Sequence, residues 1–179
     1  MNHTFHYYLK RLSFYLGGDQ PHVSWVERIR SVFGAFLGLM LVLGMAKYLG
    51  DLSGLDEWLM ASLGASALLV FALPQSPMAQ PWAVIAGNTL SALVGISVMH
   101  FMSEPLLAMP LAASLSILGM FILRCLHPPA AAVALIVVLG HVGHYRYAFF
   151  PVMVDSVLLV LVGAIYSNLT GKLYPNRPE

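Results

Sequence analysis

Six runs of apolar residues follow one another along the chain, separated by short polar or proline-rich breaks. They cover 31–49, 58–73, 82–102, 106–123, 130–140 and 149–168. A helix that crosses the hydrocarbon core needs about 20 residues, with a range of about 17 to 25. The runs at 58–73 and 130–140 are shorter than that. The pattern predicts an all-α membrane protein, a bundle of about six short transmembrane helices, in which the two short segments either span fully or are re-entrant.

Composition agrees with lipid as the main solvent of the chain. Hydrophobic residues make up 59% and charged residues only 9%, whereas soluble domains carry about 25% charged residues. The net charge of +1 gives no reason to expect a nucleic-acid partner. Cys125 is the single cysteine, so an internal disulfide framework and a multi-cysteine metal site are excluded. We expect the bilayer as a partner, no cofactor and no bound metal, with a homo-oligomer left open.

The distribution of charge predicts an orientation. Basic residues are enriched in cytoplasmic loops of membrane proteins, and the first thirty residues carry Lys10, Arg11, Arg28 and Arg30. We therefore expect residues 1–30 as a cytoplasmic segment and candidate amphipathic surface helix, 31–170 as the transmembrane domain, and 171–179 as a cytoplasmic tail. The loop at 51–57 then faces outside. No cleavable targeting signal is recognised, so we expect a multi-pass protein of the bacterial inner membrane.

A weak internal repeat relates two proline-containing segments. Residues 61–79 align with 113–131 at an offset of 52 residues, with 5 identities in 19 positions, and Pro77 falls on Pro129. In a six-span arrangement both copies point the same way. Hydrophobic segments that proline interrupts at matching places in two halves are the usual sequence pointer to a transporter's binding site.

Two loops of this repeat are candidates for binding chemistry, namely 74–81 and 124–132. Proline is favoured in the first turn of a helix, so Pro81 and Pro129 predict helix starts, which favour anions through unpaired N–H groups and the helix dipole. Their equivalent places in the repeat predict that the two loops meet at one anion site. The alternative is that both loops are tight turns at the membrane face. Asn88 either lines a polar path or bonds between helices. The predicted substrate-binding residues are Gln75, Ser76, Pro77, Gln80, Asn88, Arg124, His127, Pro128 and Pro129.

The run His127-Pro128-Pro129-Ala130 resembles the signature of the HPP family of integral membrane proteins. The blocks 61–66, 74–81 and 87–95 resemble further blocks of that family in the same order. The resemblance implies a transporter, and relatives in plants and cyanobacteria are linked to nitrite. It therefore predicts a transporter or channel for a small inorganic anion, most of all nitrite. The family often has His at the position of Gln75 and a basic residue at that of Trp82, which bears on the substrate.

Other classes of function rest on weaker patterns. Asp155 in the last run is either a partner for Lys47 or Arg146, or part of a transport path, since an acid in lipid is costly. A membrane-embedded enzyme would use His127 and Asp155, but no nucleophile–base pair is evident, so no enzyme is expected. His141 and His144 have a spacing that could hold a metal, without an acid nearby. A non-transporting scaffold subunit is the third alternative.

Overall fold

The computed structural model describes residues 23–48, 54–102 and 104–176. Most of the segment 1–30, for which we predicted a surface helix, and residues 51–53 of the predicted outer loop at 51–57 lie outside these ranges. Residues 54–57, which we predicted as part of that loop, instead begin a helix. The described residues form helices and connecting loops, without a strand. The helices are α2 (Trp25–Tyr48), α3 (Gly54–Ala72), η1 (Pro77–Ala79), α4 (Pro81–Phe101), α5 (Pro105–Ile122), α6 (Pro128–Leu139), η2 (Ala148–Met153) and α7 (Val154–Leu169).

Successive helices alternate in direction, so the bundle has two distinct ends. We call the end at which α4 and α6 begin the proline end, because it holds the loops 74–80 and 124–127. Trp82 at the start of α4 donates from Nε1 to the carbonyl of Leu123 at the end of α5 (3.1 Å). The proline end also carries Arg28, Arg30, Arg124 and Lys172, whereas Lys47 and Arg146 lie toward the opposite end. That the proline end faces the cytoplasm stays a prediction from the distribution of basic residues.

Four stretches are long and apolar enough to cross a membrane: Trp25–Met45, Pro81–Phe101, Pro105–Ile122 and Ala148–Leu169. The apolar helices Ser62–Ala72 and Pro128–Leu139 are shorter. At 1.5 Å per residue, the 12 residues of α6 extend about 18 Å, whereas the hydrocarbon core is about 30 Å thick. The prediction of an all-α membrane protein with short segments is confirmed, and the choice between six and four complete crossings stays a prediction.

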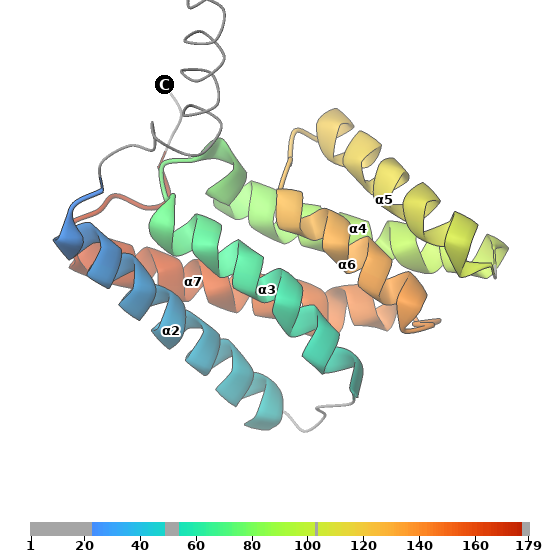
Figure 1. Ribbon diagram of the computed structural model, residues 1–179, viewed down its shortest axis with the longest axis horizontal. Coiled ribbons are helices and arrows are strands. Elements are labelled where there is room, and N and C mark those ends of the chain that lie inside the picture. Colours follow the sequence, from blue (N-terminus) through green and yellow to red (C-terminus); the bar gives the residue numbers. More distant parts are fainter. Residues whose placement is uncertain (1–22, 49–53, 103, 177–179) are drawn as a thin grey trace, which may run out of the picture.

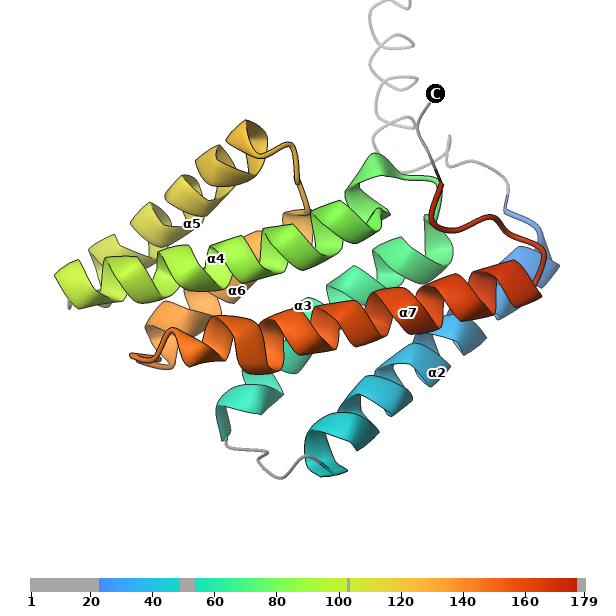
Figure 2. The ribbon, with the colours of Figure 1, turned by 180° about the vertical axis from the view of Figure 1, so that it is seen from behind.

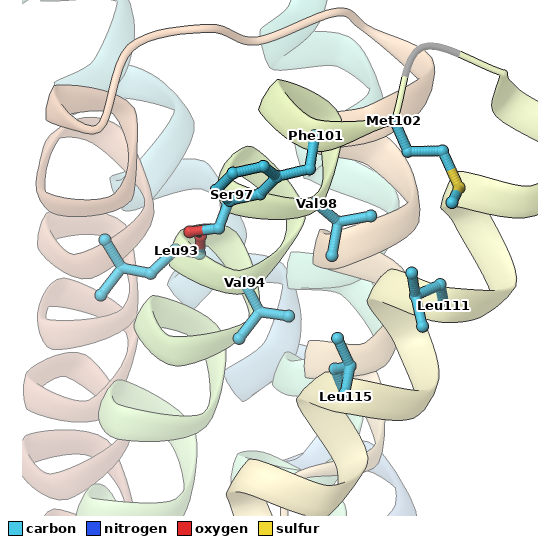
Figure 3. A pocket seen from close by; sticks show the side chains of 8 residues that line it. All are labelled: Leu93, Val94, Ser97, Val98, Phe101, Met102, Leu111 and Leu115. Carbon is cyan, nitrogen blue, oxygen red and sulfur yellow. The ribbon is translucent and has the colours of Figure 1, made fainter.

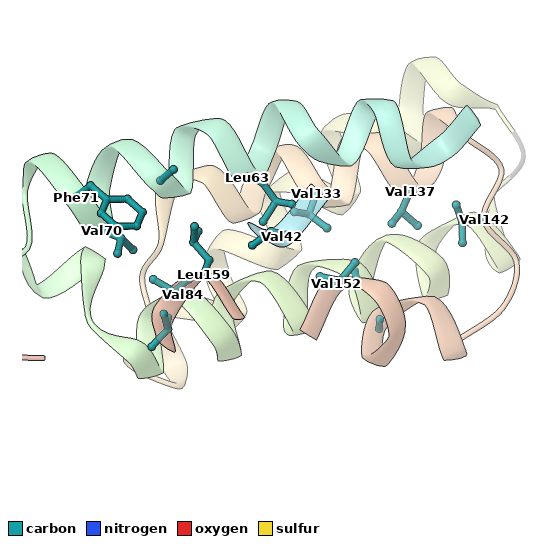
Figure 4. Packing of buried hydrophobic residues seen from close by; sticks show 14 of the residues in the cluster. Val42, Leu63, Val70, Phe71, Val84, Val133, Val137, Val142, Val152 and Leu159 are labelled. Atoms are coloured by element: carbon teal, nitrogen blue, oxygen red, sulfur yellow. The ribbon is translucent and has the colours of Figure 1, made fainter. Parts of the chain in front are cut away.

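The core lies where α6 and α4 meet the other helices. Helix α6 contacts α3, α4 and α5, and α7 lies beside α2, α3 and α4 (Figures 1 and 2). The main apolar cluster combines Phe71 of α3, Ile96 of α4, Val133 of α6 and Leu159 of α7, all of them buried (Figure 4 shows most of this cluster). Helix α6 is therefore an internal element, although its composition alone would also suit a helix that faces lipid.

Glycines allow the closest approaches between these helices. A methyl group at Gly95 of α4 would lie 2.9 Å from the carbonyl oxygen of Ala134 in α6, and one at Gly163 of α7 would lie 2.3 Å from Cγ1 of Val70 in α3. Such contacts are closer than any side chain tolerates. Small residues at helix interfaces in membranes serve this purpose, because van der Waals packing replaces the hydrophobic effect there.

Arg30 joins three helices at the proline end. Its Nη2 lies 2.6 Å from Oε1 of Glu27 and donates to the carbonyl of Phe71 at the end of α3 (3.3 Å), while Nη1 donates to Oγ1 of Thr170 after α7 (3.4 Å). Lys172 lies 3.2 Å from the other carboxylate oxygen of Glu27. The cations thus lie at the C-terminal ends of α3 and α7, where the helix dipole favours positive charge.

Candidate functional site

His127 joins the two proline loops. It directly precedes α6, its side chain is fully buried, and its Nδ1 lies 2.8 Å from the carbonyl oxygen of Met78 in the first loop. Because a carbonyl oxygen only accepts, Nδ1 carries the proton in this bond. Nε2 of the neutral ring is then the acceptor, and the hydroxyl of Ser66 in α3 donates to it over 2.8 Å. The two loops therefore meet, as the repeat predicted, with the imidazole fixed in one tautomer.

The surroundings of His127 favour its neutral form. Burial lowers the pKa of the imidazole to about 4, and the bond to the Met78 carbonyl only partly offsets that effect. At neutral pH the ring therefore serves as one donor and one acceptor, both already used, and it brings no positive charge to the loops.

The first loop is folded by its own polar side chains. The Oγ of Ser76 accepts from the N–H of Met78 (3.3 Å) and so begins the short helix η1. The amide of Gln80 donates to the carbonyls of Pro74 (2.9 Å) and Ser76 (3.0 Å). These two predicted binding residues thus hold the loop in shape, and their side chains are partly exposed.

The C-terminal tail packs onto this loop, which the sequence analysis did not predict. Tyr174 is buried and donates from its hydroxyl to the carbonyl of Ala79 (2.8 Å), and the N–H of Asn176 donates to Oε1 of Gln80 (2.9 Å). Burial raises the pKa of the Tyr174 phenol, so it remains a donor. The apolar pair Leu173 and Tyr174 in the otherwise mostly polar tail was the one sequence signal for this packing.

The second loop begins with a left-handed residue. Arg124 has φ of 52°, and the N–H of Cys125 donates to the carbonyl of Met120 (2.9 Å), as in the Schellman ending of a helix. Glycine usually occupies the left-handed position of this motif because it has no Cβ. The side chain of Arg124 is exposed at the proline end, and Cys125 is buried.

The start of α6 is held from the α3 side by two serines that the sequence analysis did not include among site residues. Ser62 donates to the carbonyl of Pro129 (3.0 Å), and Ser66 bonds His127. Pro129 is buried and Pro128 is exposed. The small-residue spacing of Ser62 and Ser66 is a sequence signal for close helix packing, but it does not indicate bonds to the start of α6.

Asn88 lies apart from the loops, further along α4. Its Nδ2 donates to the hydroxyl of Ser156 in α7 (3.0 Å), and both residues are buried. Asp155 is buried next to Ser156 in the sequence, while Lys47 and Arg146 are exposed. Polar groups therefore form a second layer inside the bundle. Of the predicted residues, Gln75, Ser76, Pro77, Gln80, Arg124, His127, Pro128 and Pro129 lie in the two loops or at the start of α6, and Asn88 does not.

A groove of about 410 Å³ lies between α4 and α5, toward the opposite end (Figure 3). Apart from Ser97, the described residues that line it are apolar, including Leu93, Phe101 and Leu115. Such a lining suits lipid chains better than an ion. It is separate from the proline loops.

No metal site is evident in the described part of the chain, where no group of three or more His, Cys, Asp or Glu side chains is placed to hold an ion. His141 and His144, whose spacing suggested a weak candidate, are both exposed after α6. Two histidines without a third ligand fall short of the three or four protein ligands of a zinc site.

Comparison with known proteins agrees with this architecture. A model of the HPP transmembrane region matches residues 20–175. One transmembrane protein of Dictyostelium discoideum is 33% identical over 175 residues, which are 93% of this chain and 56% of that protein. A second one is 32% identical over 160 residues, 86% of this chain and 56% of its own length. The chain thus spans about half the length of these relatives. No solved structure matches. The chain belongs to the HPP family of transmembrane proteins.

Proposed function

We propose that this membrane protein transports a small inorganic anion and catalyses no reaction. The observation that supports this most is the contact of the two proline loops at His127, because it brings the starts of α4 and α6 together at one end of the bundle. Helix N-termini favour anions through their dipole. Nitrite is the first candidate, a choice that comes from the family resemblance. The proposed location is a bacterial inner membrane with the proline end in the cytoplasm.

Arg124 is the residue proposed to attract the anion from water. Its side chain is exposed beside the loop contact, and its backbone is left-handed with φ of 52°. An L-residue in this conformation costs about 1–2 kcal/mol, and glycine would avoid that cost. An exposed cation at a position that costs backbone strain fits a role in function better than a role in stability. His141 has nearly the same conformation, φ of 51°, after α6 at the opposite end.

These two residues supply a matched pair of variants. Arg124→Gly and His141→Gly each relieve a left-handed residue in the same helix-ending motif, so each should raise the free energy of unfolding by about 1 kcal/mol. Only Arg124→Gly removes a cation from the proline end. We expect the initial rate of nitrite uptake into liposomes with the purified protein to fall in Arg124→Gly and to stay unchanged in His141→Gly.

Two results would contradict the proposal in different ways. Equal uptake by the two glycine variants would exclude Arg124 from the path while leaving transport intact. Wild-type liposomes that take up nitrite, nitrate, formate and chloride no faster than protein-free liposomes would exclude anion transport. A scaffold role for the bundle would then be the better interpretation.

A further inference from the structure

Two serine hydroxyls are buried between α4, α5 and α6 without a partner. Ser91 of α4 and Ser116 of α5 are both fully buried, and neither hydroxyl has a hydrogen-bond partner. Buried polar groups in proteins are almost always paired, so an unpaired one calls for an explanation. Ser116 belongs to the buried stripe of α5, together with Ala112 and Met120.

The contacts between α4 and α5 place these hydroxyls at the same level. The helices are antiparallel, and a methyl group at Gly87 would lie 3.5 Å from Sδ of Met120. One at Gly119 would lie 3.0 Å from Cδ2 of Leu90. Because the helices are antiparallel, two residues that face each other across them in this register have residue numbers whose sum is nearly the same along the whole pair. The same register brings Ser91 opposite Ser116.

The contacts between α4 and α6 show where Ser91 lies relative to the start of α6. These helices are parallel, and a methyl group at Gly87 would lie 2.9 Å from Cβ of His127. One at Gly95 would lie 2.9 Å from the carbonyl oxygen of Ala134. Ser91 lies on the same stripe of α4, midway between the two glycines. It is therefore level with the first turn of α6.

The first turn of α6 offers a dipole but few donors. Its first two residues are prolines without N–H groups, and the N–H of Ala130 donates to the carbonyl of His127 (2.9 Å). On the α3 side, the hydroxyls of Ser62 and Ser66 are already bonded. On the side of α4 and α5, the two unpaired hydroxyls supply the donors that the prolines lack.

We propose that Ser91 and Ser116 bind the anion inside the membrane, at the first turn of α6. The inference rests on the proposed transport function and places an occluded binding position within its path. The ligand class is a small monovalent anion. Helices α4, α5 and α6, which surround the proposed position, carry no Lys or Arg. The cost of dehydrating an ion grows with the square of its charge, whereas its attraction to a dipole and to hydroxyls grows only linearly. Divalent anions such as sulfate should therefore be excluded.

The test uses Ser91→Ala, Ser116→Ala and a matched control, Ser167→Ala. Ser167 is also fully buried, and its hydroxyl has no partner, but it lies near the end of α7. Removal of an unpaired hydroxyl leaves no group unsatisfied, so all three variants should fold with unchanged or higher melting temperature. We expect nitrite uptake into liposomes to fall about tenfold or more in each of the first two variants. The control should match the wild type, and wild-type uptake of sulfate should be negligible.

The possible results separate this inference from the function on which it rests. If the wild type transports nitrite and all three variants transport it equally well, the hydroxyls merely bond the carbonyls of their own helices, and the inference is overturned while transport stands. If the wild type transports no anion, the transport proposal fails, and a measurement of nitrite binding then tests the site by itself. Nitrite should then raise the melting temperature of the wild type in detergent more than that of the Ser91→Ala/Ser116→Ala double variant. Equal shifts would overturn the site.

Discussion

Protonation of His127 should destabilise the folded protein at mildly acidic pH. The pKa of the folded imidazole is lowered from 6.5 to about 4 by burial. Between these values the unfolded chain binds a proton at His127 that the folded protein does not. The free energy of unfolding therefore falls as the pH decreases through this window, and it is independent of His127 above about pH 6.5.

The magnitude follows from the difference between the two pKa values. One pKa unit corresponds to about 1.4 kcal/mol, so the gap between 6.5 and about 4 corresponds to about 3–4 kcal/mol. That is a large part of the 5–15 kcal/mol that typically stabilises a folded domain. In structural terms, a proton on Nε2 would turn the acceptor of the Ser66 hydroxyl into a donor, inside a site without water access.

The assay compares the wild type with His127→Asn at several pH values. The asparagine amide can donate to the Met78 carbonyl as Nδ1 does, but it does not titrate. Unfolding in mixed micelles, followed by tryptophan fluorescence, gives the free energy of unfolding of both proteins from pH 7.5 to 4. The variant should be less stable by about 1–3 kcal/mol at pH 7.5, because Ser66 loses its partner. This difference should shrink as the pH falls, because only the wild type loses stability through protonation of His127. The other titrating groups contribute equally to both proteins.

Parallel pH profiles of the two proteins would refute the assignment of a buried neutral imidazole. A stability difference that widens as the pH falls would be even stronger evidence against it, because it would mean that the folded protein stabilises the imidazolium. The contact between the two proline loops would then carry a cation of its own, in addition to the exposed Arg124.

Two further predictions concern packing and the C-terminal tail. Gly163→Ala should cost about 1–3 kcal/mol, because the new methyl group would lie 2.3 Å from Cγ1 of Val70. Gly64→Ala, where nothing lies within 4 Å, should gain up to about 1 kcal/mol, and thermal unfolding in detergent that ranks these two variants the other way would contradict the packing. Tyr174→Phe should lower stability by about 1 kcal/mol through loss of the bond to the Ala79 carbonyl, whereas a melting temperature equal to that of the wild type would show that the tail does not hold the loop.

The sequence by itself determined the helices and most of their limits. Apolar runs at 82–102 and 106–123 became α4 and α5, each beginning one residue earlier at a proline. This works because lipid leaves a backbone no partner except its own helix. The start of α2 differs more: it begins at Trp25 and not near 31. A charged residue ends an apolar run, but the charged residues in the first turns of α2 remain helical. Arg30 bonds Glu27 and the carbonyl of Phe71, and Arg28 donates to the carbonyl of Val23 just before the helix.

The meeting of the proline loops was predicted from the repeat, whereas their chemistry required the tertiary structure. From the sequence, His127 was expected to offer a donor or a positive charge to an anion. Only its burial between Ser66 and Met78 shows that the ring is neutral, with both nitrogens already hydrogen-bonded. The tail's bond from Tyr174 to Ala79 joins residues 95 positions apart. Local patterns report on which helix face is apolar, but not on which distant polar groups share an interior. That choice depends on helix register, which close contacts at glycines such as Gly87 and Gly95 determine.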